Sequence, residues 1–222
     1  PDPSGMTLRF PNTPACGTVM LPDNLAPYSR IQPAAPDFLL IFPVQTVLPG
    51  KTWETALGHV FAFSEAELEQ ERINLRPRLA WPAASFDENR RRWNGYLRRL
   101  DQALLPRYRR EPYRTLALKC LQTLLLNWRS PAGEFRHAGL FPSLHFRGFH
   151  GFWTWDSWKH AAALAALDPA LAKEQVRVLF DFQDEAGMVA DCVFRDPAVE
   201  APNWRDTKPP LAAWRSEARR GG

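Results

Sequence analysis

The chain has 222 residues, of which 45% are hydrophobic, and it carries a formal net charge of +4 at pH 7. This composition is ordinary for a globular protein with a hydrophobic core and argues against a disordered chain. The longest apolar runs, residues 38–42 and 161–167, are far shorter than the roughly 20 residues that a membrane-spanning helix needs, so no span is predicted.

The cysteines and the N-terminus leave the compartment open between cytoplasm and periplasm. No basic region followed by an apolar stretch opens the sequence, so no targeting signal is predicted. The first residue is Pro1 rather than Met, which leads us to expect a fragment. The three cysteines are odd in number and widely spaced, which favours neither a disulfide scaffold nor a zinc motif: Cys16, Cys120 and Cys192.

Residues 1–75 have the pattern of strands and loops, which predicts a β-rich N-terminal domain. Within residues 38–63, apolar and aromatic runs flank Pro49-Gly50, a pair suited to the centre of a type II turn, so we expect a hairpin there. The prolines are dense before residue 50 and return in residues 74–85, which are therefore predicted to be a linker. We place a domain boundary near residue 76.

The pattern becomes helical after this boundary. Ser85, followed three residues later by Glu88, matches a capping box, so a linker helix is predicted to open there within residues 76–109. A second helix is predicted over residues 112–128, because large apolar residues recur on one face: Leu116, Leu121, Leu124, Leu125 and Trp128.

Further helices follow towards the C-terminus. A third is predicted over residues 156–167. A fourth begins at once, with Asp168 as N-cap and Pro169 at the first helical position, where a missing N–H costs nothing. A loop over residues 188–207 then precedes another predicted helix at residues 209–220.

Most of the positive charge in the middle of the chain is arginine within residues 88–114. A helix face rich in arginine can contact phosphate, which keeps a nucleic-acid binder open as an alternative function. No recognised reader motif accompanies these arginines, and an ordinary arginine-covered surface helix explains the same pattern.

The most unusual stretch is residues 149–160, FHGFWTWDSWKH, in which Asp156 is surrounded by aromatic residues. Aromatic faces suit the C–H surfaces of a sugar ring, and a carboxylate accepts hydrogen bonds from two adjacent hydroxyls, so this stretch can form the wall of a sugar site. Lys159 can pair with Asp156 or contact the ligand. The ordinary alternative is a hydrophobic anchor in which Asp156 caps a helix and His160 is structural. Composition alone leaves both interpretations open.

A second stretch, residues 180–214, is rich in carboxylates, which can do acid and base work but usually line a solvated loop. Within it, residues 203–210, NWRDTKPP, place an aromatic, a cation, an acid and a second cation directly before a proline-initiated helix. The sequence has no phosphate loop, CxxC pair, HExxH or G-x-S-x-G motif. No cofactor or metal is predicted, because these histidines lack a metal-ligand spacing: His137, His145, His150 and His160.

Three motifs together resemble glycoside hydrolase family 63, in its bacterial branch of glucosidase and mannosylglycerate-hydrolase-like enzymes. They are W-D-S-W-K, F-Q-D-E-x-G-M-x-x-D and R-D-T-K-P-P-L-A-A-W, in the family's order and spacing, and the resemblance covers about residues 130–214. It implies an α+β multidomain fold: the end of an N-terminal β-sandwich in residues 1–75, a linker helix in residues 76–109, and the first helical hairpins of an incomplete (α/α)6 toroid in residues 110–222.

The resemblance also implies an inverting, α-glucosidase-like hydrolase of small α-linked glucosides or glycosyl-glycerate-type substrates. In the family's pattern, Asp156 holds the sugar or the attacking water within an aromatic pocket, and the residues after Pro202 line its rim. A sugar is then the expected partner, with no nucleic acid and no membrane. The implied substrate-binding residues are Phe152, Trp153, Trp155, Asp156, Lys159, Asn203, Trp204, Arg205, Asp206 and Lys208.

One departure from the family pattern limits the expected activity. The family's general acid lies in a W-E-S-G-M-D type motif and its general base lies near the end of the toroid, and neither motif occurs in residues 1–222. We therefore expect a truncated product that is inactive alone, or one half of a split enzyme whose missing C-terminal half of the toroid is a separate chain. A non-catalytic carbohydrate-binding module is the other alternative.

Overall fold

The computed structural model describes residues 5–34, 37–198 and 200–204, and the chain divides into two units, residues 1–89 and 90–222. The division falls inside the helix α2 (Pro82–Ala103). The predicted boundary near residue 76 falls inside the preceding helix, α1 (Glu65–Ala80). The predicted domain limits at residues 76 and 110 remain predictions.

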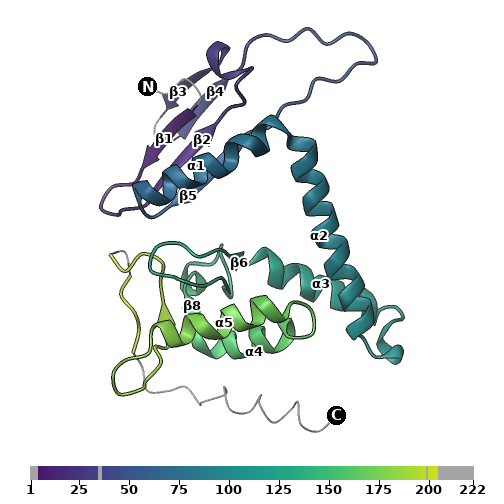
Figure 1. The fold of residues 1–222 in the computed structure, drawn as a ribbon, viewed down its shortest axis with the longest axis vertical. Coiled ribbons are helices and arrows are strands. Elements are labelled where there is room, and N and C mark those ends of the chain that lie inside the picture. Colours follow the sequence, from purple (N-terminus) through teal and green to yellow (C-terminus); the bar gives the residue numbers. More distant parts are fainter. Residues whose placement is uncertain (1–4, 35–36, 199, 205–222) are drawn as a thin grey trace. The chain divides into compact units, whose positions relative to one another are not determined.

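The first unit contains two small antiparallel sheets. β1 (Gly5–Arg9), β2 (Cys16–Met20) and β5 (Gly58–Ala62) form one sheet in that order, with Thr7 opposite Thr18 and Thr18 opposite Val60. β3 (Arg30–Ala34) and β4 (Asp37–Ile41) form the other, after a short 3-10 helix, η1 (Ala26–Tyr28). α1 lies along the first sheet (Figure 1), because Leu68 packs on the buried side chains of that sheet: Cys16, Val60 and Ala62.

The hairpin predicted in residues 38–63 is wrong, although its turn is correct. Gly50 has φ +74°, and the Lys51 N–H donates to the Leu48 carbonyl at 3.0 Å, so Pro49-Gly50 does turn the chain. Residues 42–57 nevertheless form no strand, and β4 and β5 pair with β3 and β2 instead of with each other. Val44, for example, is 97% exposed, so the segment buries little apolar surface that would stabilise a strand.

Residues 74–85, predicted to be a linker, are helical on both sides of Trp81. α1 includes Pro77 and ends at Ala80, and α2 starts at Pro82, where a missing N–H is harmless. Ser85 and Glu88 lie inside α2 and do not open a helix.

The true cap in this region opens α1. The Ser64 hydroxyl accepts from the Glu67 N–H at 3.1 Å, while Glu67 Oε2 accepts from the Phe63 N–H at 2.8 Å. The first bond satisfies an N–H of the first helical turn that has no carbonyl partner, and the second holds the N–H of Phe63, the residue before the N-cap. The pattern of a serine followed three residues later by a glutamate therefore does mark a helix start in this region, at Ser64 instead of Ser85.

The helices predicted for the second unit are confirmed with small shifts. α3 covers Tyr113–Leu126, α4 covers Thr154–Leu164 and α5 covers Pro169–Asp181. Asp168 is the N-cap of α5, since its Oδ1 accepts from the Leu171 N–H at 3.0 Å. The helix predicted at residues 209–220 lies outside the described residues.

Short strands and turns connect these helices. β6 (Trp128–Arg129) pairs with β7 (Gly139–Leu140), and β8 (Phe152–Trp153) pairs with β9 (Cys192–Val193). Two 3-10 turns complete the connections, η2 (Pro106–Tyr108) and η3 (Arg147–Phe149). Helices mixed with small antiparallel sheets confirm the α+β class. Among the described residues, no helix is both long enough and apolar enough to cross a membrane.

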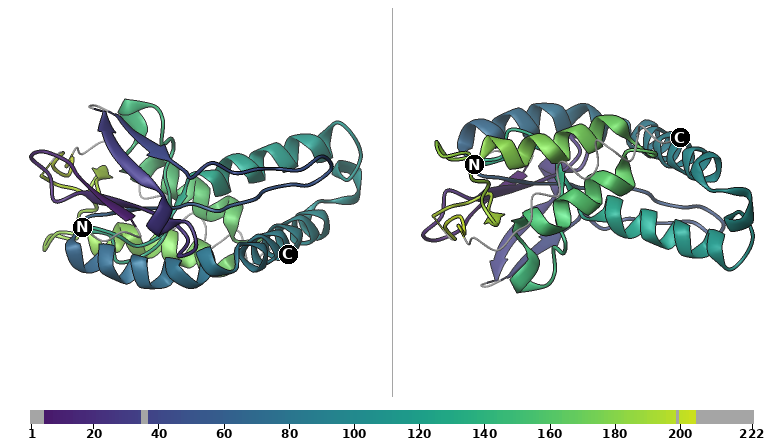
Figure 2. Two further views of the ribbon diagram at one scale, coloured as in Figure 1. Left: turned by 90° about the horizontal axis from the view of Figure 1, so that it is seen from above. Right: turned by 90° about the horizontal axis from the view of Figure 1, so that it is seen from below.

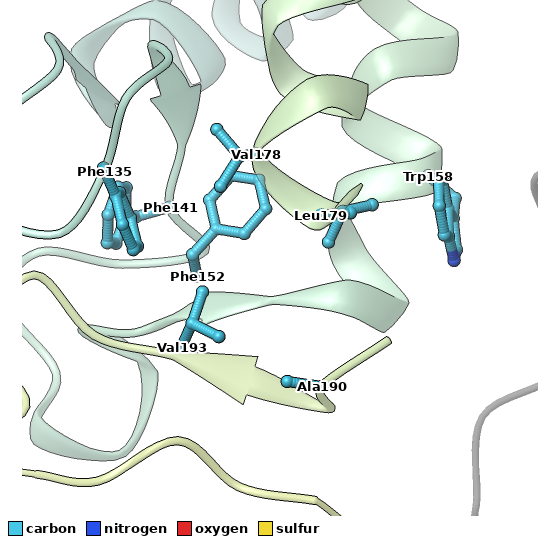
Figure 3. Close-up of a cluster of buried hydrophobic side chains, with 8 residues drawn as sticks. All are labelled: Phe135, Phe141, Phe152, Trp158, Val178, Leu179, Ala190 and Val193. Atoms are coloured by element: carbon cyan, nitrogen blue, oxygen red, sulfur yellow. The ribbon is translucent and has the colours of Figure 1, made fainter. Parts of the chain in front are cut away.

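α4 and α5 form an antiparallel helical pair and lie side by side in both views of Figure 2. Their inner faces and the neighbouring strands enclose the main core of the unit, drawn in Figure 3. Gln175 of α5 also fixes β7, because its Oε1 accepts from the Leu140 N–H at 2.6 Å and its Nε2 donates to the Leu140 carbonyl at 3.3 Å. The core residues are Phe135, Phe141, Phe152, Trp158, Val178, Leu179, Ala190 and Val193.

Candidate functional site

The candidate site is built around the start of α4, where the aromatic stretch turns from strand into helix. The Thr154 N–H donates to the Asp191 carbonyl at 2.9 Å, and the Thr154 hydroxyl donates to the Ala190 carbonyl. The Ser157 hydroxyl, fully buried, donates to the Trp153 carbonyl at 2.7 Å. The first turn of α4 is therefore anchored from both sides, which fixes the direction of the side chains that it carries.

Asp156 lies in this first turn and is half-buried. A carboxylate at a helix N-terminus is stabilised by the unpaired N–H groups and by the helix dipole. Asp156 is also one helical turn before His160, and its charge acts on that ring. Its position thus agrees with a helix-start role and, at the same time, leaves part of the carboxylate accessible.

The predicted aromatic wall divides into accessible and buried members. Trp155 is 38% exposed, and Lys159 Nζ lies 4.3 Å from its ring centroid, a cation–π contact. Trp153 is half-buried and packs edge-on against Phe149, with ring centroids 6.3 Å apart. Phe152, in contrast, is 0% exposed and belongs to the core in Figure 3. The prediction that Phe152 lines the pocket is corrected here, because a side chain without accessible surface supports the wall from behind.

The first two residues of the NWRDTKPP stretch, Asn203 and Trp204, follow the far edge of the strand that contains Cys192. The Asn203 N–H donates to the Cys192 carbonyl at 2.8 Å, and the Asp191 N–H donates to the Asn203 carbonyl at 2.8 Å. Cys192 pairs on its other side with Trp153, so the short strands bring Trp153 and Asn203 to either side of one residue. Trp204, next along the chain, is 43% exposed.

Three of the predicted rim residues, Arg205, Asp206 and Lys208, lie outside the described residues. Among the described residues, the structure therefore places the Asn203–Trp204 segment one strand away from β8, with Cys192 between the two.

Burial controls the charge state of two groups beneath the site. It lowers the pKa of His160 below the ordinary 6.5; Asp156 and a backbone hydrogen bond at Leu140 oppose this effect, and Lys159 adds to it. Burial likewise raises the pKa of the Cys192 thiol far above its ordinary value, helped by the negative charges of Asp191, Glu200 and Asp156. His160 is thus a neutral ring at pH 7, and Cys192 is a protonated thiol rather than a nucleophile.

Two residues near the site, Asp191 and Gly151, have structural roles that their sequence context did not predict. Asp191 is only 1% exposed and its main chain holds both Thr154 and Asn203, yet the composition of residues 180–214 placed it among ordinary loop acids. Gly151 is the other: a Cβ there would lie 2.3 Å from Cys192 Sγ and 2.7 Å from Phe194 Cε1. The position of Asp191 at the end of the F-Q-D-E-x-G-M-x-x-D motif was the available sequence signal for that residue. No local pattern marks Gly151.

The part of the chain that the structure describes contains no group of three or more His, Cys, Asp or Glu side chains that could hold a metal ion. What the arrangement offers is an accessible carboxylate, a cation over an indole, and two exposed indoles, set on a buried support. Such a mixture of flat apolar faces and hydrogen-bonding groups suits a polyhydroxylated ligand.

Residues 150–220 match the model of the mannosylglycerate hydrolase MGH1-like glycoside hydrolase domain. The match begins next to Gly151 and covers both motifs described above, W-D-S-W-K and R-D-T-K-P-P-L. It includes less than half of the chain, and it lies wholly in the second unit. Over this segment the chain is similar to a glycoside hydrolase domain, which confirms the resemblance to glycoside hydrolases of the family 63 type.

Proposed function

We propose that the start of α4, together with the segment ending at Trp204, forms a sugar-binding subsite of a glycoside hydrolase. The observation that carries this proposal is the backbone pairing of Asn203 with Cys192. Through β9 it links the aromatic stretch before α4 to the start of the NWRDTKPP stretch, about 50 residues further along the chain, and the family match includes both stretches. Trp155 and Trp204 are exposed and are carried by two segments that are linked through β9, and a shared surface ligand explains this better than core packing alone.

The side chains support this assignment through their chemistry. Asp156 supplies an acceptor for two adjacent hydroxyls, and Trp155 and Trp204 supply exposed rings for the C–H face of a sugar. Lys159 supplies a donor next to Trp155. The Trp153 indole N–H is buried and has no hydrogen-bond partner among the described residues, so it can donate to a ligand that reaches it.

The finer parts of the proposal follow from the family resemblance. They are an inverting mechanism, a small α-linked glucoside or glycosyl-glycerate-type substrate, and a β-sandwich followed by helical hairpins of an (α/α)6 toroid. Asp156 is given the role of holding the sugar or the attacking water, and Arg205, Asp206 and Lys208 the role of the rim. No carboxylate of residues 1–222 matches the family's acid or base motif, so we expect binding without turnover from these residues.

The direct test is calorimetric titration of the full chain with glucose, an α-linked disaccharide and mannosylglycerate. We expect saturable binding to at least one of them, weakened about tenfold or more by Asp156→Asn, since that change removes a charged acceptor while keeping the shape. Glu185→Gln is the matched control, because it also removes one negative charge but from an exposed loop of the same unit. Equal affinities for wild type and Asp156→Asn would contradict the assignment.

Two further measurements separate the alternatives. Release of free glucose from the bound disaccharide would show catalysis by this chain, whereas saturation without release supports a binding module or an incomplete enzyme. Strongly salt-dependent binding of duplex DNA, with no response to any of the three sugars, would instead support the arginine-rich nucleic-acid binder.

A further inference from the structure

A cavity of the second unit, away from the candidate site, has walls suited to a sugar ring. It has a volume of about 280 Å³ and is formed by parts of α2, the end of α3 with β6, and the start of α5. Ligand pockets usually measure roughly 300–1,000 Å³, so this one accommodates a single ring-sized ligand. The lining residues on which the argument rests are Arg92, Trp93, Tyr96, Trp128, Asp168 and Glu174.

Three half-buried aromatic side chains make up the apolar wall. Trp93 and Tyr96 lie one turn apart on α2 and pack edge-on, with ring centroids 6.0 Å apart and planes inclined by 74°. Trp128, at the start of β6, packs against the core cluster that includes Leu140 and Leu164. Their rings are held by packing, so a ligand meets flat surfaces that are already ordered.

Two carboxylates of α5 reach the same cavity and are held in place. Asp168 Oδ1 accepts from the Leu171 N–H and its Oδ2 accepts from the Tyr96 hydroxyl at 3.1 Å. Glu174 Oε1 accepts from Arg177 at 2.8 Å. A carboxylate has about four lone-pair sites, so each group retains the capacity to accept from a ligand hydroxyl.

The charges around the cavity identify the class of ligand. Asp168 and Glu174 disfavour an anion, and the positive charge of Arg92 partly offsets theirs, so the charges that line the cavity nearly balance. A neutral ligand with many hydroxyls can accept from Arg92, donate to both carboxylates and stack on an indole. We propose that this cavity is a second carbohydrate-binding site that takes one neutral pyranose ring.

The two sites lie at opposite ends of the α4–α5 pair. The candidate site surrounds the first turn of α4, whereas Asp168 directly follows the short turn that joins the two helices. α4 has 11 residues and therefore extends about 16 Å, at 1.5 Å per residue. A single ring cannot contact both, so the second site is independent of the function proposed for the first.

Tryptophan indole N–H signals test the two sites separately. The full chain, labelled with ¹⁵N-tryptophan, is titrated with methyl α-D-glucoside, with choline as cation probe and inorganic phosphate as anion probe, and signals are assigned from single Trp→Phe variants. We expect the glucoside to shift the Trp93 and Trp128 signals with a dissociation constant of the order of millimolar. Glu174→Gln should weaken that shift about fivefold, and Glu134→Gln, an exposed charge in the same unit, should leave it unchanged.

Each outcome decides the matter. Glucoside-dependent shifts at Trp93 and Trp128 that persist in Asp156→Asn support the second site, whatever happens at Trp155. Shifts at Trp155 alone would overturn it while leaving the first site intact. Shifts at Trp93 caused by choline or phosphate but not by the glucoside would also overturn it, as would equal titrations for wild type and Glu174→Gln. Circular dichroism of each variant confirms that the fold is retained.

Discussion

The main chain of Asn203 is paired with that of Cys192: the Asn203 N–H donates to the Cys192 carbonyl at 2.8 Å, and the Asn203 carbonyl accepts from the Cys192 N–H at 3.4 Å. Because Cys192 also pairs with Trp153, this contact places Asn203 one strand away from β8, the strand that leads into α4. The side chain of Asn203 is not needed for it.

A pair of substitutions at this residue separates main-chain from side-chain effects. Asn203→Pro removes the N–H and leaves the buried Cys192 carbonyl without its donor, so we expect a loss of about 1–3 kcal/mol in the free energy of unfolding and loss of sugar binding. Asn203→Ala keeps the backbone bonds and should change stability by less than about 0.5 kcal/mol. Urea denaturation measures both; equal losses would show that the backbone pairing is unimportant.

Gly151 is expected to be intolerant of any side chain. Gly151→Ala puts a Cβ 2.3 Å from Cys192 Sγ, so the β8–β9 pair must shift, at a cost of about 1–3 kcal/mol. Gly95→Ala is the control: the nearest atom to its new Cβ is Arg99 Nη1 at 3.6 Å, and glycine is unfavourable within a helix. We expect Gly95→Ala to stabilise the protein by about 0.5–1 kcal/mol in thermal or chemical denaturation. Similar effects of the two changes would contradict the close contact at Gly151.

Gln175 is expected to contribute more to stability than an ordinary helix glutamine. Gln175→Leu leaves both the N–H and the carbonyl of the buried Leu140 without the bonds that Gln175 supplies, and we expect a loss of about 2–3 kcal/mol in the free energy of unfolding. Gln70→Leu, on an exposed face of α1, loses only an exposed bond to Asn74 and should change stability by less than about 0.5 kcal/mol. A loss at Gln175 no larger than at Gln70 would show that water replaces those bonds.

The stability of the protein should fall in mild acid because of His160. Burial lowers the pKa of His160 below 6.5, so between that lowered value and 6.5 the unfolded chain binds more protons than the folded one. The contribution of neutral His160 to the free energy of unfolding is complete above pH 6.5, and it is lost as the pH falls through the folded-state pKa of His160. Denaturation at several pH values between 7.5 and about 5 measures how the free energy of unfolding depends on pH. We expect the part of this slope that comes from His160 to vanish in His160→Gln. The exposed His145→Gln should retain it; an unchanged slope in His160→Gln would contradict the prediction.

The three cysteines should differ sharply in reactivity. Cys120 is exposed on α3, whereas Cys16 and Cys192 are buried, and burial raises the pKa of both buried thiols. A thiol-specific reagent at pH 8 should therefore label one cysteine in the native protein and three in denaturant. Mass spectrometry identifies the site, and Cys120→Ser should abolish native labelling. Fast native labelling of Cys192 would show that β9 opens readily.

Local chemistry made some elements predictable. Asp168-Pro169 marks the start of α5 because the aspartate caps the first turn and proline needs no donor there, and the periodic leucines of residues 112–128 mark α3. The turn at Gly50 was equally local. The pairing partners of the strands that flank this turn could not be predicted from local sequence, because pairing of β5 with β2 depends on a segment about 40 residues away. Pro77 was likewise a poor local signal for a linker, because α1 continues past it. Burial of Leu68 and Leu79 by tertiary packing stabilises this helix.

The sequence by itself determined the composition of the candidate site, a carboxylate among aromatic rings, and an ordered set of motifs that resembles a glycoside hydrolase. Only the tertiary structure decided which of these residues are accessible. Phe152 and Trp155 are indistinguishable as aromatic neighbours of Asp156 in the sequence, but β8 directs Phe152 into the core and the first turn of α4 leaves Trp155 at the surface. The physical reason is that accessibility depends on what packs against a side chain. Here that packing comes from Val178, Leu179 and Val193, which no local pattern assigns to Phe152.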